Sequence, residues 1–239
     1  MTLVMSCWLF FGVPDKPGLP RPEPLAAQWA GIRTVFADRY FWHFAPLGFA
    51  QIGGFMAVQS LWSSAWLIQV NGFSRALAAE HLAAMNFAML VAYALIGMLA
   101  TGLSRRGIGT IYLLGGGMLL ALLTLLLIIT RASDQHLLLW MAYGLFSSTG
   151  TLVYAQVSTG FPVALSGRAS TSLNLVVFAG AFSLQWGMGI LIDTLREHGF
   201  SAETAHVNAF AVLFVVQAAA CLWLFVGGKV GGVKALAPP

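Results

Sequence analysis

The sequence predicts an all-α membrane protein with six transmembrane helices, and three observations lead to this fold class. Of the 239 residues, 59% are hydrophobic and only 8% are charged, whereas a soluble domain carries about 25% charged residues. Mean hydropathy is +0.82. Six apolar runs, separated by short polar segments, are each long enough to cross a membrane. They cover residues 45–70, 82–103, 108–130, 137–161, 170–193 and 205–227. This composition excludes a soluble enzyme, a disordered regulator and a nucleic-acid binder.

The chain before the first run has two expected parts. Met1 to Val13 is apolar, carries no Lys or Arg, and at about 1.5 Å per residue is too short to span. We expect the truncated end of a preceding transmembrane helix, with an interfacial segment as the alternative. Residues 14–44 begin as a proline-rich cytoplasmic linker and continue from Leu25 as an amphipathic helix lying in the membrane interface. Its apolar face consists of Leu25, Trp29, Ile32, Phe36 and Tyr40.

The basic residues predict how the runs are oriented. Lipid offers no hydrogen bonds to loose backbone groups, so the runs must be helices, and their connections alternate between the two membrane surfaces. Nine of the twelve cations then fall on one side: Lys16, Arg21, Arg33, Arg39, Arg105, Arg106, Arg168, Lys229 and Lys234. The other side has Arg75, Arg131 and Arg196. Because cytoplasmic loops are enriched in cations, we expect a cell (inner) membrane protein whose tail, residues 228–239, is cytoplasmic.

Polar side chains are concentrated on the first and fourth runs, where they recur at helical spacing. The first run has Gln51, Phe55, Gln59, Trp62, Trp66 and Gln69, and the fourth has Tyr143, Ser147, Thr151, Tyr154 and Ser158. Such groups either bond one helix to another or line a water-filled path. For the two stripes together we favour a substrate path. Its candidate residues are Gln51, Gln59, Trp62, Trp66, Ser147, Thr151, Tyr154, Asn174 and Gln185.

The six runs follow the order polar, mixed, apolar, and then repeat it. This order predicts a 3+3 inverted repeat. A second trace is the pattern Gly97, Thr101, Leu103, Gly107 after the second run, which recurs as Gly189, Asp193, Leu195, Gly199 after the fifth. The two patterns lie on opposite sides of the membrane, as an inverted repeat requires.

These features together resemble the C-terminal six-helix half of a major facilitator superfamily transporter. In the segment GMLATGLSRRG, Gly97, Arg105 and Arg106 match the family's cytoplasmic gate motif, whereas Thr101, Gly102 and Ser104 depart from it. The fifth-run segment GRASTSLNLVVFAGAFSLQWGMGILID is also similar. The resemblance implies transport of a small solute by alternating access. It also implies that Met1 to Val13 ends the sixth helix of a twelve-helix chain.

Catalytic patterns are missing from the sequence, and we expect neither an enzyme nor a cofactor or metal. The histidines lie in loops or at the ends of runs, away from Ser147 and Ser148, and neither HExxH nor a P-loop occurs. The expected partners are the lipid bilayer, a small-molecule substrate, and a missing N-terminal six-helix half or a second copy, with no nucleic acid. Asp193 is expected at a helix end, so any coupling group would lie in the missing half. The alternatives are a truncated or structural membrane fragment without transport activity, or a channel-like six-helix oligomer.

Overall fold

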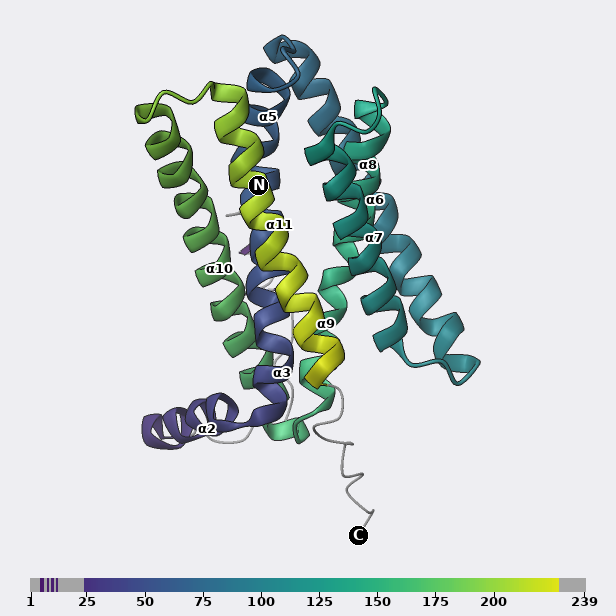
Figure 1. Cartoon of the computed structure of the whole chain (residues 1–239). Coiled ribbons are helices and arrows are strands. Elements are labelled where there is room, and N and C mark those ends of the chain that lie inside the picture. The colour runs from purple at the N-terminus through teal and green to yellow at the C-terminus, as the bar shows by residue number, and fades with distance from the viewer. Residues whose placement is uncertain (1–4, 7, 9, 11, 13–23, 228–239) are drawn as a thin grey trace.

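The computed structural model describes residues 5, 6, 8, 10, 12 and 24–227 (Figure 1). Our predictions for the proline-rich linker 14–23, the tail 228–239 and much of 1–13 lie outside these residues. In the described part every regular element is a helix. The α-helices are α2 (Leu25–Ala37), α3 (Arg39–Leu47), α4 (Gly54–Ala57), α5 (Ser63–Gln69), α6 (Arg75–Arg105), α7 (Thr110–Thr130), α8 (His136–Ser147), α9 (Leu152–Thr159), α10 (Val163–Glu197) and α11 (Ala202–Gly227). The π-helical turns are η1 (Gly48–Gly53) and η2 (Val58–Trp62), and η3 (Ser148–Thr151) is a 3₁₀ turn.

Five helical segments are long and apolar enough to cross a membrane, as expected of an integral membrane protein. They are Arg75–Arg105, Thr110–Thr130, His136–Thr159, Val163–Glu197 and Ala202–Val226. Several extend beyond the apolar runs because polar residues can occupy the end turns of a helix. α6, for example, begins at Arg75, where the hydroxyl of Ser74 accepts a hydrogen bond from the backbone N–H of Leu77 at 3.2 Å.

The remaining predicted span, residues 45–70, is helical but irregular. α3, η1, α4, η2 and α5 follow one another without a break from Arg39 to Gln69, and we call them the 39–69 segment. Each π turn inserts an extra residue and rotates the next part of the helix about its axis. By analogy, α8, η3 and α9 together form the 136–159 segment.

The connections between helices lie at two opposite ends of the bundle (Figure 1). At one end, the α2 end, lie α2 and the connections 106–109 and 160–162; the connections 70–74, 131–135 and 198–201 lie at the far end. The described cations are sorted accordingly. Arg33, Arg39, Arg105, Arg106 and Arg168 belong to the α2 end, and Arg75, Arg131 and Arg196 to the far end. At the far end, Arg131 forms an ion pair with Glu203.

The 39–69 segment crosses α10 with the two backbones in contact. A Cβ added at Gly53 would lie 2.7 Å from the carbonyl oxygen of Val177, and one added at Gly180 would collide with the carbonyl of Phe49. The 136–159 segment meets α6 in a similar way, since a Cβ at Gly144 would lie 3.0 Å from the carbonyl oxygen of Met85. Small residues at such crossings let membrane helices approach closely. Each segment is therefore packed against a helix from the other half of the chain.

α7 and α11 pack against each other and cover one side of these four helices. α7 lies along α8, and α11 lies along the 39–69 segment, which passes behind it in Figure 1. A buried exchange of hydrogen bonds joins the latter pair: the Gln51 amide donates to the carbonyl of Gln217 at 3.2 Å, and the Gln217 amide donates to the carbonyl of Ala50 at 3.1 Å. Between α7 and the 136–159 segment, Thr149 packs on Gly117. We call the opposite side of the 39–69 segment, the 136–159 segment, α6 and α10 the open face. Asn86, Thr151 and Asn174 are exposed there.

α2 lies across one end of the bundle, against α10. Leu25 and Trp29 are 74% and 69% exposed, whereas Val35 is fully buried. The helix predicted from Leu25 through Phe44 is interrupted at Asp38, whose carboxylate accepts a hydrogen bond from the backbone N–H of Tyr40 at 2.7 Å. This N-cap ends α2 and starts α3 in a new direction.

Candidate functional site

The polar stripe predicted on the first run does not stay on one face. Because η1 and η2 change the rotation of the helix, its members point in different directions. Gln51, Phe55 and Trp66 are buried, Gln59 and Trp62 are half-buried, and Gln69 is exposed. Their α-helical spacing predicted a single stripe, and this prediction holds only if the helix is regular throughout.

Gln51 and Trp66 face α11 rather than the open face. Besides its bond to Gln217, the Gln51 amide contacts the sulfur of Cys221 at 3.0 Å. Trp66 is 1% exposed and packs on Phe210 with ring centroids 4.5 Å apart. Both residues hold helices together, and the structure does not bring them to the other predicted path residues.

Gln59 joins the 39–69 segment to α6 at the open face. Its amide donates to the side-chain oxygen of Asn86 at 2.7 Å and contacts the sulfur of Met89 at 3.3 Å. Asn86 also donates to the carbonyl of Leu82 at 2.8 Å and remains exposed. The pair keeps amide groups available at the surface.

Gln185 joins the same segment to α10. Its side-chain oxygen accepts a hydrogen bond from the hydroxyl of Ser60 at 3.2 Å, and its backbone carbonyl accepts one from the indole N–H of Trp62 at 3.1 Å. The Trp62 ring lies across Gly189, where an added Cβ would be 3.5 Å from the indole. Ser60 was not among the predicted residues because it is adjacent to Gln59 and so does not fit the spacing of the stripe.

The 136–159 segment contributes a third polar contact. The hydroxyl of Tyr154 donates to the side-chain oxygen of Asn174 on α10 at 2.8 Å, and one turn away Ser158 and Ser170 share a hydrogen bond of 2.7 Å. Thr151 is exposed and its hydroxyl donates only to the carbonyl of Ser148. Ser147 is half-buried.

A pocket of about 410 Å³ lies between η2 and α10, toward the far end of the bundle. We call it the Trp62 pocket. Its walls are Leu61, Trp62, Phe182, Gln185, Trp186, Gly189, Ile190 and Asp193. Gln185 and Trp62 are the only predicted path residues in it. Asp193 also belongs to this wall. It is one of the two acidic residues of α10; the other is Glu197, the last residue of the helix.

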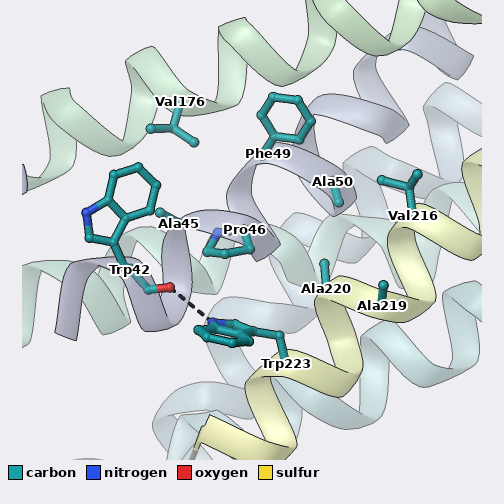
Figure 2. Close-up of a pocket in the computed structure, with 10 residues that line it drawn as sticks. All are labelled: Trp42, Ala45, Pro46, Phe49, Ala50, Val176, Val216, Ala219, Ala220 and Trp223. Carbon is teal, nitrogen blue, oxygen red and sulfur yellow. Dashed lines mark hydrogen bonds between the residues drawn. The ribbon is translucent and has the colours of Figure 1, made fainter. Parts of the chain in front are cut away.

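A second hollow, of about 470 Å³, lies between residues 42–50, α10 and α11 (Figure 2). Its walls are the apolar surfaces of Trp42, Ala45, Pro46, Phe49, Ala50, Val176, Val216, Ala219, Ala220 and Trp223. The indole N–H of Trp223 donates to the carbonyl of Trp42 at 3.1 Å. With no ionisable side chain in its wall, this hollow offers contacts to apolar chains and little else.

The predicted gate motif lies at the α2 end. Arg105 is in the last turn of α6, Arg106 follows as its cap, and Gly107 completes the turn with φ of +74°. Gly97 has nothing within 4 Å of the position where its Cβ would be. Neither arginine forms an ion pair within the described residues. The structure therefore leaves these three residues on an open surface of α6.

No protein-family model matches the chain, and a search of curated proteins finds no relative. The resemblance to the major facilitator superfamily stays a prediction. The function of the chain is therefore inferred from the contacts, burial and charges of its described residues.

Proposed function

We propose that this chain is one six-helix half of a secondary transporter, of the kind found at the C-terminal side of major facilitator proteins. It moves a small solute across the inner membrane by alternating access, with its C-terminus in the cytoplasm. One observation carries the proposal: polar side chains from four helices form hydrogen bonds with one another on the open face, away from α7 and α11. The contacts are Gln59 to Asn86, Ser60 to Gln185, and Tyr154 to Asn174.

Helix bonding alone does not account for this face. Gln51 and Gln217 show what a pure contact looks like here, since both amides are buried and bonded across helices. Asn86, Thr151 and Asn174 are exposed. Exposed amides and hydroxyls are unfavourable against lipid, so this face requires water or another protein surface. A solute path between two six-helix units supplies both.

The exchange of helices between the two halves of the chain supports a 3+3 inverted repeat. The first segment, 39–69, lies against the fifth helix, α10, and the fourth, 136–159, lies against the second, α6. The third and sixth helices, α7 and α11, pack together. This correspondence is what two three-helix units related by a pseudo-two-fold axis produce. The 39–69 segment is then also a membrane span, the first of the six in chain order, with two π turns in a helix that lines the path.

The open face also suggests which partner is required. The two helices that border it, α6 and α10, have exposed apolar residues that include Phe87, Tyr93, Phe178 and Trp186. We infer that a second six-helix unit, either another half or a second copy, covers α6 and α10. The path then lies between the two units, next to the 39–69 and 136–159 segments.

Two measurements on the purified chain test this proposal. The first is native mass in detergent, where we expect a particle larger than a single copy, with a second copy or another six-helix protein. The second uses proteoliposomes exposed to a mixture of amino acids, sugars, organic acids and amines, with mass spectrometry of the trapped solutes. At least one solute should accumulate with the natural chain and fail to accumulate with N86L/N174L. A monomeric particle that traps no solute above empty liposomes would instead indicate a fragment without transport activity.

A further inference from the structure

The Trp62 pocket combines aromatic rings with one carboxylate. Trp62 comes from η2, and Trp186 and Asp193 come from α10. Residues 182, 186 and 189 are three or four positions apart, as are 185, 189 and 193, so these side chains follow one face of α10. The pocket volume of about 410 Å³ falls within the range of about 300 to 1,000 Å³ that small-molecule sites occupy.

The carboxylate of Asp193 has no partner of its own. It forms neither a hydrogen bond nor an ion pair with any residue that the structure describes. Arg196 lies one turn nearer the end of α10 and forms no ion pair with it. Asp193 is exposed, so an organic cation that enters the pocket can pair with its carboxylate.

The rings add an attraction of the same sign. The face of an indole attracts a cation within about 6 Å, and the gain is about 0.5 kcal/mol when exposed and about 2 kcal/mol when desolvated. The indole N–H of Trp62 is already used by the carbonyl of Gln185. This bond fixes the plane of the ring, which also lies across Gly189. Trp186 is 65% exposed, so its ring is free to close over a ligand.

From these features we propose that the Trp62 pocket binds an organic cation, such as a quaternary or primary amine with an apolar substituent. The ammonium group lies near Asp193 between Trp62 and Trp186, and the apolar substituent lies along Phe182 and Leu61. This inference rests on the proposed transport function and names its substrate class. Its charged group, Asp193, lies outside both polar stripes.

Direct binding to the purified chain in zwitterionic nanodiscs tests the inference, with radiolabelled benzyltrimethylammonium as the probe. We expect saturable binding, and none for benzenesulfonate, which has the same ring and the opposite charge. D193N should weaken binding about tenfold or more, which corresponds to about 1.4 kcal/mol, and D193E should restore most of it. W186L should weaken binding about two- to tenfold. The matched controls D134N, an acid in the connection 131–135, and W29L, an exposed tryptophan on α2, should leave binding unchanged.

Three results would overturn the inference. They are no saturable binding of benzyltrimethylammonium, binding of benzenesulfonate as tight as that of benzyltrimethylammonium, or binding of the cation by D193N and W186L as tight as by the natural chain. Thermal unfolding of each variant establishes that the fold is retained, and W186L, at an exposed position, keeps the test valid if D193N unfolds. Because the assay requires no transport, its outcome is separate from the proteoliposome result. Cation binding without any uptake would contradict only the transport proposal, whereas uptake of a neutral or anionic solute without cation binding would contradict only this inference.

Discussion

The crossing of the 39–69 segment over α10 depends on Gly53, and substitution by alanine should separate the two helices. The added Cβ would lie 2.7 Å from both the carbonyl oxygen of Val177 and the backbone nitrogen of Ala181, whereas ordinary contact begins at 3.4 Å. The backbones must therefore move apart by about 0.7 Å. Both atoms belong to backbone that cannot rotate away. Overpacking of this kind costs about 1 to 3 kcal/mol.

Gly187→Ala on α10 is the matched control, because its Cβ would meet nothing within 4 Å. Both substitutions gain the same helix propensity, at most about 1 kcal/mol, so their difference isolates the packing cost. We expect G53A to unfold with a free energy about 1 to 3 kcal/mol below that of G187A, measured by SDS titration in mixed micelles. Equal stability of the two variants would refute the close crossing and with it the assignment of the 39–69 segment as a packed membrane helix.

Three further predictions concern individual contacts. Gln217→Leu removes the buried bond to the carbonyl of Ala50 and should lower the free energy of unfolding by about 0.6 to 1.7 kcal/mol without changing solute affinity; an altered affinity would place this residue in the path. Trp66→Ala should cost about 3 to 5 kcal/mol because Trp66 is 1% exposed, while Trp186→Ala should change stability by no more than about 0.5 kcal/mol, and similar losses would contradict the assigned burial. Tyr40→Phe removes the 2.8 Å bond from its hydroxyl to the carbonyl of Gln156 and should cost about 0.5 to 1.5 kcal/mol by thermal unfolding, with no loss if that contact is absent.

Composition and hydropathy were sufficient to predict the helical membrane class, because a single property, apolar length, decides it. Five of the six predicted spans correspond to helices long enough to cross. The polar stripe of the first run was less predictable. Its residues follow α-helical spacing, but the two π turns rotate Gln51 and Trp66 toward α11 and leave Gln59 at the open face. Such turns depend on how the segment packs against α10 and α11, and the spacing of residues in the sequence does not indicate this packing.

The partners of the polar residues were also invisible in the sequence. Gln59 meets Asn86 and Tyr154 meets Asn174 across different helices, and the order of the chain does not indicate these pairs. Asp193 was expected to be an interfacial residue at the end of a run. In the structure it lies four residues before the end of α10, at Glu197, and it also lines a pocket with two tryptophans.

Water accessibility in the membrane decides whether the open face borders a solvated path. In a background without Cys7 and Cys221, single cysteines would replace Asn86 and Thr151 on the open face, and Leu123 and Leu222 on α7 and α11. All four positions are exposed in the isolated chain. A solvated path predicts that a membrane-impermeant maleimide labels the first pair and not the second, while a permeant reagent in detergent labels all four. Absence of labelling at positions 86 and 151, or equal labelling of all four in the membrane, would contradict a solvated path on this face.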